Sequence, residues 1–592
     1  MKRELKLTTS LTALAIAVSL LSVPTIGNAA EVPAWTVISS GSKERPIELS
    51  LTGIEEVANP FDPAQADLWA TVTSPDNSAI EVPLFWYQGY RSSVNGNNPW
   101  TTAVGDPTWL LRFRSDLIGE YRIRLHGTVN SKTVTADEYR ITSTVKHSSQ
   151  IKIAGKGFTR DDAPFVPIAY NIAWANRHEE KVKYEKWFKA ASAGGVNVAR
   201  VWMPAWDMGI EWIDTGLGDY RKRLPNAWAL DQVFEIGAKY DVSIDLTLIN
   251  HGAFSESTNP EWFASPYNEL NGGPLKSPSE FATNAEAIKF WERKLRYIAA
   301  RYSSYSSLFT WEWWNEVNFT PISESDLSAW MVRSKTKLYQ WDPYRHMITT
   351  SWSSAASIRD WSPVDFVSTH VYDSSDPIKS LRNQYEAIRS AVPDKPIMVA
   401  EMGSGTTSED VFSDPKGLHL HNSQWASLFV GFGSPASYWW WDNYVDPLNL
   451  WPITSGLKKL IKGADPVNMT PDEILGPTRT TALLLKSPDL TLGWIRHNDY
   501  QLSAKASLLL QAAITALKTK KPIQTKFPDP VVKAESIKIP VTNPGNYLIK
   551  FMEPKSGKAI STLKASTSGK TLKFTVPKFT GDIAFRVEKG AA

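Results

Sequence analysis

Hydrophobic and polar residues follow three different patterns along this chain of 592 residues. After about residue 31, short segments alternate apolar with polar residues and are separated by turn residues, which is typical of antiparallel strands. We predict strands at 47–51, 66–73, 80–86, 108–114, 119–127 and 139–145. The polar, glycine-bearing stretch 147–157 follows them. The pattern therefore predicts an N-terminal β-sandwich over residues 31–150.

The second pattern alternates apolar strands with amphipathic helices. Strands are predicted at 165–171, 196–203, 242–250, 308–316, 346–351, 365–372, 396–401 and 436–442. Helices are predicted at 179–193, 227–240, 280–302, 324–340, 377–391 and 423–432, and the connection 354–361 has room for only a short helix. Eight strands with a helix after nearly every one predict a (β/α)₈ TIM barrel, which we assign to residues 158–465.

Strand patterns return in the last part of the chain. They lie at 490–496, 537–539, 545–552, 572–576 and 582–587, while 507–521 fits either a helix or a loop. We predict a second β-sandwich over residues 466–592. The expected fold class is thus multidomain, with a TIM barrel flanked by N-terminal and C-terminal β-sandwich domains.

Residues 1–29 have the pattern of a secretory signal peptide: a basic start, an apolar stretch at 11–23, and small residues at 27–30. An uncleaved membrane anchor is the alternative. We expect a secreted protein, extracellular or at the cell surface, with no membrane contact after signal cleavage. The sequence contains no cysteine, so stability must come from core burial rather than disulfides. A formal net charge of +3 gives no indication of a nucleic-acid partner, and we expect a monomer.

Polar and aromatic residues gather where the predicted barrel strands end, which is where barrel enzymes carry their active sites. Two apolar strands finish in carboxylates, Glu316 and Glu401. A facing pair of carboxyl groups is what glycosidic-bond hydrolysis requires. Every predicted strand except the fifth ends in a polar or aromatic residue. Beside the two glutamates, the candidates for binding substrate are Asn171, Arg200, His251, Asn315, His370, Tyr372, Trp440 and Trp441.

These positions together resemble clan A glycoside hydrolases, close to family 5. The resemblance rests on Asn315-Glu316, Glu401, Arg200, the His370-Val371-Tyr372 segment, and the run Trp439-Trp440-Trp441. It implies that Glu316 is the general acid/base and Glu401 the nucleophile of a retaining double displacement. It further implies that Arg200 lies beside the nucleophile and that the tryptophans form a floor for the sugar.

The N-terminal part has a resemblance of its own. Segments 85–89 and 111–114, followed by 119–121, are similar to the immunoglobulin-like domain that precedes such a barrel in a set of bacterial proteins. The substrate of most members of that set is not settled. This resemblance therefore supports the reaction better than it supports a particular sugar.

Elementary electrostatics adds expectations about the pKa values. Arg200 is expected to lower the pKa of Glu401, while an apolar setting raises the pKa of Glu316. Tyr372 is expected to donate a hydrogen bond to Glu401. Glu312, on the same strand as Glu316, is the rival carboxylate, and a structural ion pair with an arginine is its simpler interpretation.

The predicted function is a secreted retaining β-glycoside hydrolase that acts on a polysaccharide or oligosaccharide. An endo-β-glucanase or β-mannanase is the first choice, with an exo-acting β-glycosidase or a transglycosidase as alternatives. A non-catalytic carbohydrate-binding surface protein is a further alternative, and His251 and His370 could be core histidines. No cofactor or metal is expected, since the chain has neither a histidine-rich triad nor a phosphate-binding glycine loop, and the acidic stretch 410–414 fits a solvated loop.

Overall fold

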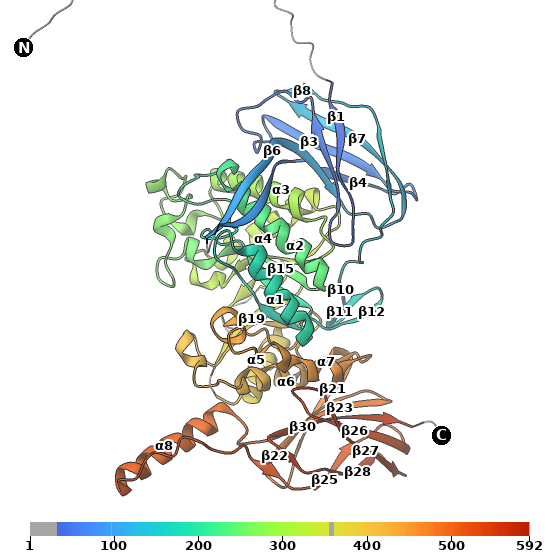
Figure 1. Ribbon diagram of the computed structural model, residues 1–592, viewed down its shortest axis with the longest axis vertical. Helices are drawn as coiled ribbons and strands as arrows, with labels where there is room; N and C mark the ends of the chain where they lie inside the picture. Colours follow the sequence, from blue (N-terminus) through green and yellow to red (C-terminus); the bar gives the residue numbers. More distant parts are fainter. Residues whose placement is uncertain (1–31, 96–97, 354–359, 374, 591–592) are drawn as a thin grey trace, which may run out of the picture.

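The computed structural model describes residues 32–95, 98–353, 360–373 and 375–590. Three parts follow one another along the long axis of the molecule: an N-terminal β part, a central part of strands and helices, and a C-terminal β part (Figure 1). The predicted signal peptide and most of the predicted short helix at 354–361 lie outside the described residues. In the described ranges, no helix is both long and apolar enough to cross a membrane.

The N-terminal part consists of antiparallel strands in two sheets. One sheet has the order β1-β2-β6-β5 and the other β4-β3-β7-β8, with β9 paired to β7. Alternate residues of β3 are buried, and together with those of its neighbour β7 they pack against the buried residues of β2 and β6 in one apolar cluster. The strands are β1 (Ala34–Ser40), β2 (Ile47–Thr52), β3 (Ala66–Thr73), β4 (Ala79–Pro83), β5 (Phe85–Asn95), β6 (Asn98–Phe113), β7 (Gly119–Val129), β8 (Lys132–Thr133) and β9 (Tyr139–Ser143).

A small antiparallel sheet leads from the N-terminal part into the central part. It contains β10 (Lys152–Ala154), β11 (Gly157–Arg160) and β12 (Ala163–Phe165). Phe158 of β11 packs edge-on against Phe309 and Phe366, which lie at the amino ends of central strands. This sheet therefore closes the end of the central part that is opposite the strand ends predicted to carry the site.

The central strands pair in parallel around a ring. Two sheets, β13-β14-β15-β16-β17 and β18-β19-β20, are joined through Tyr438, which forms parallel bridges to Tyr170 and Met402. The strands are β13 (Ala169–Asn171), β14 (Val198–Trp202), β15 (Ser243–Asn250), β16 (Leu308–Asn315), β17 (Met347–Thr349), β18 (Ser351–Trp352), β19 (Val367–Tyr372) and β20 (Ile397–Gly403). Every residue of β15 and β16 is buried, as expected for parallel strands covered by helices.

The eighth predicted strand, 436–442, is the main correction to the predicted elements. Only Tyr438 pairs there, because the chain leaves the ladder in a π-helical turn in which the Val445 N–H bonds to the Trp440 carbonyl. The six predicted helices are present, and α7 is additional. The helices are α1 (Glu180–Gly194), α2 (Leu224–Tyr240), α3 (Ala285–Tyr302), α4 (Glu324–Trp341), α5 (Pro377–Ala391), α6 (Leu418–Val430) and α7 (Ser455–Ile461).

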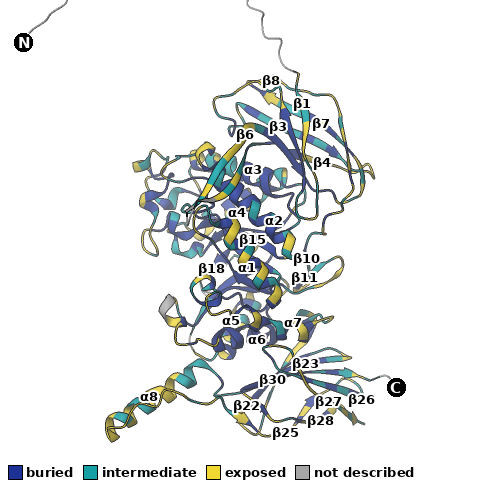
Figure 2. Ribbon diagram, viewed as in Figure 1, coloured by how far each residue is buried: buried dark blue, intermediate teal, exposed yellow. Residues whose placement is uncertain are grey.

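The C-terminal part is built on a sheet of order β21-β22-β23-β30-β26-β27, with the shorter pairs β25-β28 and β24-β29. Its strands are β21 (Thr470–Leu475), β22 (Thr480–Lys486), β23 (Leu490–His497), β24 (Val531–Val532), β25 (Glu535–Pro540), β26 (Gly545–Met552), β27 (Ala559–Thr567), β28 (Thr571–Val576), β29 (Phe579–Thr580) and β30 (Asp582–Lys589). The segment left open by the sequence is a helix, α8 (Leu502–Thr519), which has no buried residue and projects from this part (Figure 2).

Buried charges join the N-terminal part to the central part. Arg112 of β6 forms ion pairs with Glu48 of β2 at 2.7 Å and with Asp231 of α2 at 2.8 Å. Arg301 of α3 pairs with the same Asp231 at 2.5 Å. All four residues are buried, so each charge depends on its partners for compensation.

We expect Arg112→Ala to lower the free energy of unfolding by about 3–5 kcal/mol, because it leaves buried carboxylates with fewer partners. Urea denaturation measures the change. Arg140→Ala is the control, since Arg140 pairs with the exposed Glu120 and should matter little. Equal effects of the two substitutions would contradict this account of the interface.

Candidate active site

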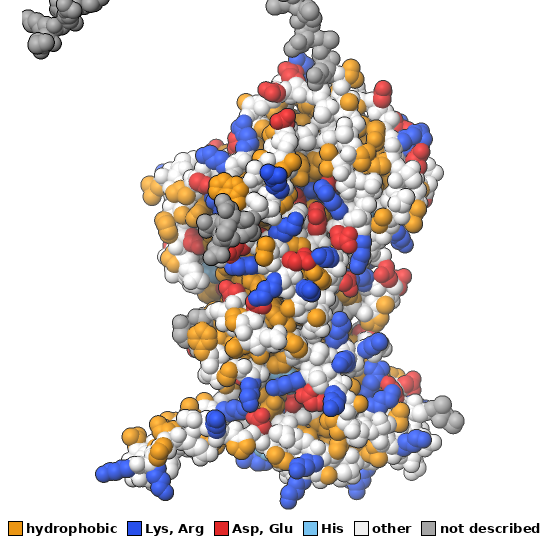
Figure 3. Space-filling model, viewed as in Figure 1, with side chains coloured by type: hydrophobic (Ala, Val, Ile, Leu, Met, Phe, Trp, Pro, Cys, Tyr) orange, Lys and Arg blue, Asp and Glu red, His pale blue; other side chains and the backbone are white. Residues whose placement is uncertain are grey.

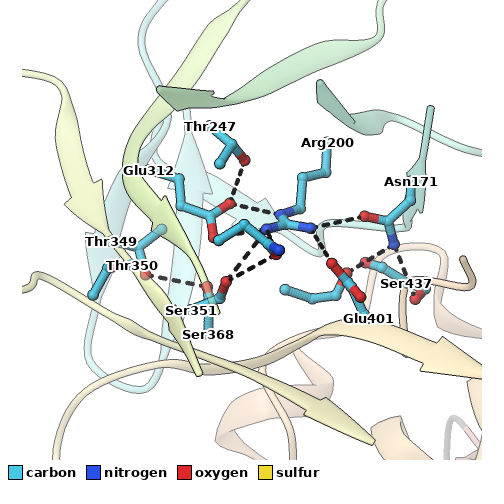
Figure 4. Close-up of polar contacts among 12 residues, drawn as sticks. Asn171, Arg200, Thr247, Glu312, Thr349, Thr350, Ser351, Ser368, Glu401 and Ser437 are labelled. Atoms are coloured by element: carbon cyan, nitrogen blue, oxygen red, sulfur yellow. Dashed lines mark hydrogen bonds and ion pairs between the residues drawn. The ribbon is translucent and has the colours of Figure 1, made fainter. Parts of the chain in front are cut away.

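Arg200 of β14 lies at the centre of a buried polar network inside the ring of strands (Figure 4). Its guanidinium donates to Glu312 Oε2 from Nε at 2.6 Å and to Glu312 Oε1 from Nη2 at 2.8 Å. Nη1 donates to Glu401 Oε1 at 2.6 Å. A single cation therefore holds carboxylates from two strands, β16 and β20, in fixed orientations.

Glu312 is fully buried, and its two oxygens are occupied by Arg200 and by the Thr247 hydroxyl, which donates at 2.7 Å. Burial opposes ionisation of Glu312, but the charge of Arg200 outweighs burial and lowers the pKa of this carboxyl. Glu312 is therefore a permanent counter-ion for Arg200. The ion pair that the sequence suggested for this rival carboxylate is present.

Glu401 is 3% exposed and accepts a hydrogen bond on each oxygen, from Arg200 on Oε1 and from the Tyr372 hydroxyl on Oε2 at 2.5 Å. The hydrogen bond expected from Tyr372 is thus present. The expected direction of the pKa shift was wrong. Burial raises the pKa of Glu401, and His370, Arg200 and Tyr372 oppose that shift without reversing it.

Glu316 follows β16 directly and has left-handed backbone angles, φ 47° and ψ 50°. This conformation is strained for a residue with a side chain, and such strain gathers at functional sites. The Glu316 N–H donates to the Ser351 hydroxyl at 3.2 Å, which holds the turn. The side chain is 14% exposed, and burial raises its pKa, in the direction that the sequence predicted.

His370 lies between the two glutamates. Its Nδ1 is 2.9 Å from Glu316 Oε1 and 3.4 Å from Glu401 Oε2. Burial lowers the pKa of His370 to about 4, so the ring is neutral near pH 7. Ligand atoms of Glu316, His370 and Glu401 all lie within 4.8 Å of one another, which makes the two carboxyl groups a facing pair.

Asn315 and His251 extend this network. Asn315 Oδ1 accepts from Arg200 Nη2 at 2.8 Å, and its Nδ2 lies 3.0 Å from His251 Nδ1. His251 Nδ1 is also 3.6 Å from Glu316 Oε2, and burial lowers the pKa of this histidine. Arg200, Asn315, His251 and Glu316 therefore form a continuous polar chain.

Asn171 is fully buried, and both the oxygen and the nitrogen of its amide are hydrogen-bonded within the protein. Its Oδ1 accepts from Arg200 at 3.1 Å, and its Nδ2 donates to the Ala400 carbonyl at 2.9 Å. This amide bridges β13, Arg200 and the residue before Glu401. Its position suits alignment of the nucleophile better than contact with a substrate, which was its predicted role.

Tryptophans form an aromatic cluster beside the network. Trp441 is buried and packs edge-on against Trp174, with ring centroids 4.9 Å apart. Trp439 contacts Trp202 at 5.2 Å. Trp440 is partly exposed, so it is better placed to offer a ring face to a sugar than the buried Trp441 is.

Sequence reasoning missed residues of the network, among them Thr247, Ser351 and Asp245. Ser351 ends the strand that seemed to carry no candidate, yet its hydroxyl accepts from both Arg200 Nη2 and the Glu316 N–H. Asp245 of β15 pairs in register with Arg200, and burial together with the charge of Glu312 raises its pKa well above the ordinary value. Serine is too common at strand ends to stand out, but an aspartate inside an apolar strand was a usable signal.

Glu316, His370 and Glu401 are also the kind of residues that bind a divalent metal. Here Arg200 already supplies a positive charge 2.6 Å from Glu401. The guanidinium therefore competes with any cation for the Glu401 carboxylate.

No protein-family model and no curated protein matches this chain. A Bacteroides vulgatus ATCC 8482 protein, described as a candidate glycoside hydrolase, is similar in structure with a TM-score of 0.59 and 15% identity, over 92% of this chain and 99% of that chain. A family 5 glycoside hydrolase from the same organism has a TM-score of 0.46 and 12% identity, over 75% of this chain and 94% of that chain. A β-1,4-D-mannanase from Cryptopygus antarcticus has a TM-score of 0.38 and 16% identity, over 52% of this chain and 95% of that chain. The first similarity establishes a shared fold, and the other two are too distant to carry an argument.

The opposite pKa shifts of Glu312 and Glu316 predict opposite effects of their neutral replacements. Glu312→Gln removes the carboxylate that compensates the buried charge of Arg200. It should therefore lower the free energy of unfolding by about 3–5 kcal/mol near pH 7. Glu316→Gln removes an ionised form that burial disfavours, so it should stabilise the protein near pH 7. Chemical denaturation across a pH series measures both effects.

The pH dependence separates the two cases. The gain in unfolding free energy from Glu316→Gln should be absent below about pH 4.3, the pKa of a glutamate in the unfolded chain. It should grow as the pH rises from there through the raised pKa of Glu316 in the folded protein. The cost of Glu312→Gln should persist at about pH 4.3 and fade only at lower pH, because its folded pKa is lowered. Effects of the same sign at neutral pH would contradict the assignment.

Proposed function

We propose that this protein is a retaining glycoside hydrolase that cleaves β-glycosidic bonds in a polysaccharide or oligosaccharide. The observation that carries the proposal is the facing pair Glu316 and Glu401, with oxygens within 4.8 Å. Retaining enzymes hold their two carboxyl groups about 5–5.5 Å apart, whereas inverting enzymes need a wider gap for water. The shared fold with a candidate glycoside hydrolase supports the same reaction class.

In the first step Glu401 attacks the anomeric carbon of the sugar while Glu316 transfers its proton to the leaving oxygen. The bond from that carbon to the leaving oxygen breaks, and an ester to Glu401 forms. Arg200 and Tyr372 hold one oxygen each, which fixes the direction of attack. Glu316 forms no direct ion pair with an arginine among the described residues, and burial raises its pKa, which favours the protonated form that a general acid needs.

In the second step Glu316 is a carboxylate and removes a proton from water. The water oxygen attacks the anomeric carbon, the ester breaks, and Glu401 leaves as a carboxylate. Because Glu401 carries no charge in the ester, its repulsion of Glu316 is absent at this stage. His370, neutral and 2.9 Å from Glu316, can donate a hydrogen bond to the base.

The proposal includes a domain organisation. Residues 158–465 form a (β/α)₈ barrel, 31–150 an immunoglobulin-like β-sandwich, and 466–592 a second sandwich. Parallel pairing around a ring closed by Tyr438 supports the barrel. Two antiparallel sheets that share one apolar core support the first sandwich. Residues 1–29 are proposed as a signal peptide, which implies a secreted or cell-surface protein, and a monomer is proposed separately.

The fold alone does not identify the substrate. An endo-acting β-glucanase or β-mannanase is the first choice, with an exo-β-glycosidase or transglycosidase using the same carboxylates. Partly exposed Trp440 and its neighbour Trp439 support stacking against sugar rings. The non-catalytic alternative has to explain why a strained backbone and a buried arginine hold two carboxylates face to face.

We expect both Glu316→Gln and Glu401→Gln to lower kcat on a responsive β-glucan or β-mannan by at least about a thousandfold, since each removes a group that acts in the transition state.

Product analysis by NMR should show that the wild-type protein retains the β-configuration. On an aryl glycoside whose leaving group departs without a proton, azide should restore turnover to Glu316→Ala by replacing water in the second step. Gln232→Ala is the control, because this residue lies on α2 outside the network and should keep activity.

Unchanged activity of both glutamine variants on every glycan would contradict the catalytic assignment. Inverted products would contradict the retaining mechanism while leaving the glycosidase class intact.

Chelation tests the proposed independence from metals. We expect EDTA treatment and dialysis to leave hydrolysis unchanged, because Arg200 supplies the positive charge of the site. Loss of activity that returns with one divalent metal would show instead that Glu316, His370 and Glu401 bind an ion.

A further inference from the structure

Helix α8 has an apolar surface that no other part of the described chain buries. Leu510 is 63% exposed and Leu517 is 83% exposed, and no residue of the helix is buried. Single exposed apolar residues are ordinary on a protein surface. An entire helix of this kind needs a partner, because most helical stability comes from packing an apolar face.

One face of α8 is continuously apolar. Helical spacing places Leu502, Leu509, Leu510, Ala513 and Leu517 on that face with Ile514 at its edge, and places Gln511, Thr515 and Lys518 on the opposite face, which also carries Leu508. The hydroxyls of Ser507, Thr515 and Thr519 donate to carbonyls four residues earlier in the helix, at distances of 3.0, 2.8 and 2.8 Å. These satisfied hydroxyls lose less on approaching an apolar phase than free ones would.

The charged residues of this helix and of the segment that follows it are all basic up to Asp529. Between Asp499 and Asp529 the sequence contains five lysines and no acidic residue. Lys505 pairs with Asp529 at 2.8 Å, whereas Lys518, Lys520 and Lys521 are exposed at the far end of the helix. Figure 3 shows hydrophobic and basic side chains together on the projection at the lower left.

We propose that α8 binds the surface of a bilayer that contains anionic lipid. The face formed by Leu502, Leu509, Leu510 and Leu517 enters the region between headgroups and acyl chains, and the lysines contact the anionic headgroups. This combination of apolar face and basic residues is what interfacial helices use. The helix does not meet the length and hydropathy expected of a membrane span, so it lies on the bilayer rather than across it.

Other occupants match only half of these features. An anionic polymer would neutralise the lysines but leave the leucines in water. A second copy of the chain would cover the leucines but bring no opposite charge to the lysines. A bilayer with anionic headgroups satisfies both.

The inference does not depend on the proposed function. The network around Arg200 belongs to the central part, whereas α8 belongs to the C-terminal part (Figure 1). Binding through α8 would hold the central part close to a membrane surface and leave its chemistry unchanged.

Vesicle sedimentation tests the proposal with the chain from Glu31 onward, since the apolar stretch at 11–23 would itself bind lipid. Vesicles of phosphatidylglycerol mixed with phosphatidylcholine should bind the protein, and vesicles of phosphatidylcholine alone should bind it much more weakly. The triple variant Lys518→Gln, Lys520→Gln, Lys521→Gln should bind roughly a hundredfold more weakly at low salt, because each lysine contributes about fivefold.

The triple variant Leu509→Ser, Leu510→Ser, Leu517→Ser should bind at least about tenfold more weakly, because it removes the apolar contribution. The matched control Gln511→Ser, Thr515→Ser changes the opposite face and should bind as the wild type does. Because none of these side chains is buried, all variants should keep the unfolding midpoint of the wild type.

Failure to bind phosphatidylglycerol vesicles would overturn the proposal. Binding that the leucine substitutions leave unchanged would also overturn it, because the lysines alone would then explain the result. A dimer in analytical ultracentrifugation that the same leucine substitutions dissociate would assign the face to a second copy of the chain instead.

Discussion

The buried guanidinium of Arg200 is the interaction on which the central part of this protein depends. A cation inside a ring of parallel strands is costly to desolvate and is tolerated only with partners of good geometry. Glu312 and Glu401 supply those partners from β16 and β20, and Asn171 and Asn315 accept further hydrogen bonds. The same contacts that compensate the charge also fix the strand ends relative to one another.

This constraint separates the roles of three carboxylates. Glu312 forms the ion pair that compensates the charge of Arg200, so it is not a candidate for the general acid or the nucleophile. Glu401 is held on both oxygens but keeps a pKa raised by burial. Glu316 escapes direct contact with Arg200 and stands on a strained turn, partly open to solvent. A carboxylate held on both oxygens thus faces a second carboxyl that stands on a strained turn, and this geometry is compatible with the proposed double displacement.

The main residues of the site could be predicted from the sequence, because they stand at the ends of recognisable apolar strands. The continuous apolar strands and their polar ends marked Glu316, Glu401, Arg200 and Tyr372, and the contact of Tyr372 with Glu401 followed. The sign of the Glu401 pKa shift could not be predicted, because it depends on the balance between burial and Arg200. Ser351 accepts a hydrogen bond from the backbone N–H of Glu316, and the sequence gives no sign of this contact.

Other features escaped prediction for different physical reasons. Strand β5 loses its apolar alternation after Tyr87, so its pairing with β6 is visible only in three dimensions. The last predicted barrel strand contracted to Tyr438 because a π-helical turn follows it. Helix α8 was ambiguous because its apolar residues include the unbroken run Leu508–Leu510, which does not follow a clear helical period.

The most direct test of the account is to trap the sugar on its nucleophile. A 2-deoxy-2-fluoro glycoside with an activated leaving group slows the second step more than the first, so the ester accumulates. After incubation with the gluco- and manno-configured reagents, peptide mass spectrometry should find the sugar on Glu401. Attachment to Glu316 or Glu312 would contradict the assignment of roles around Arg200.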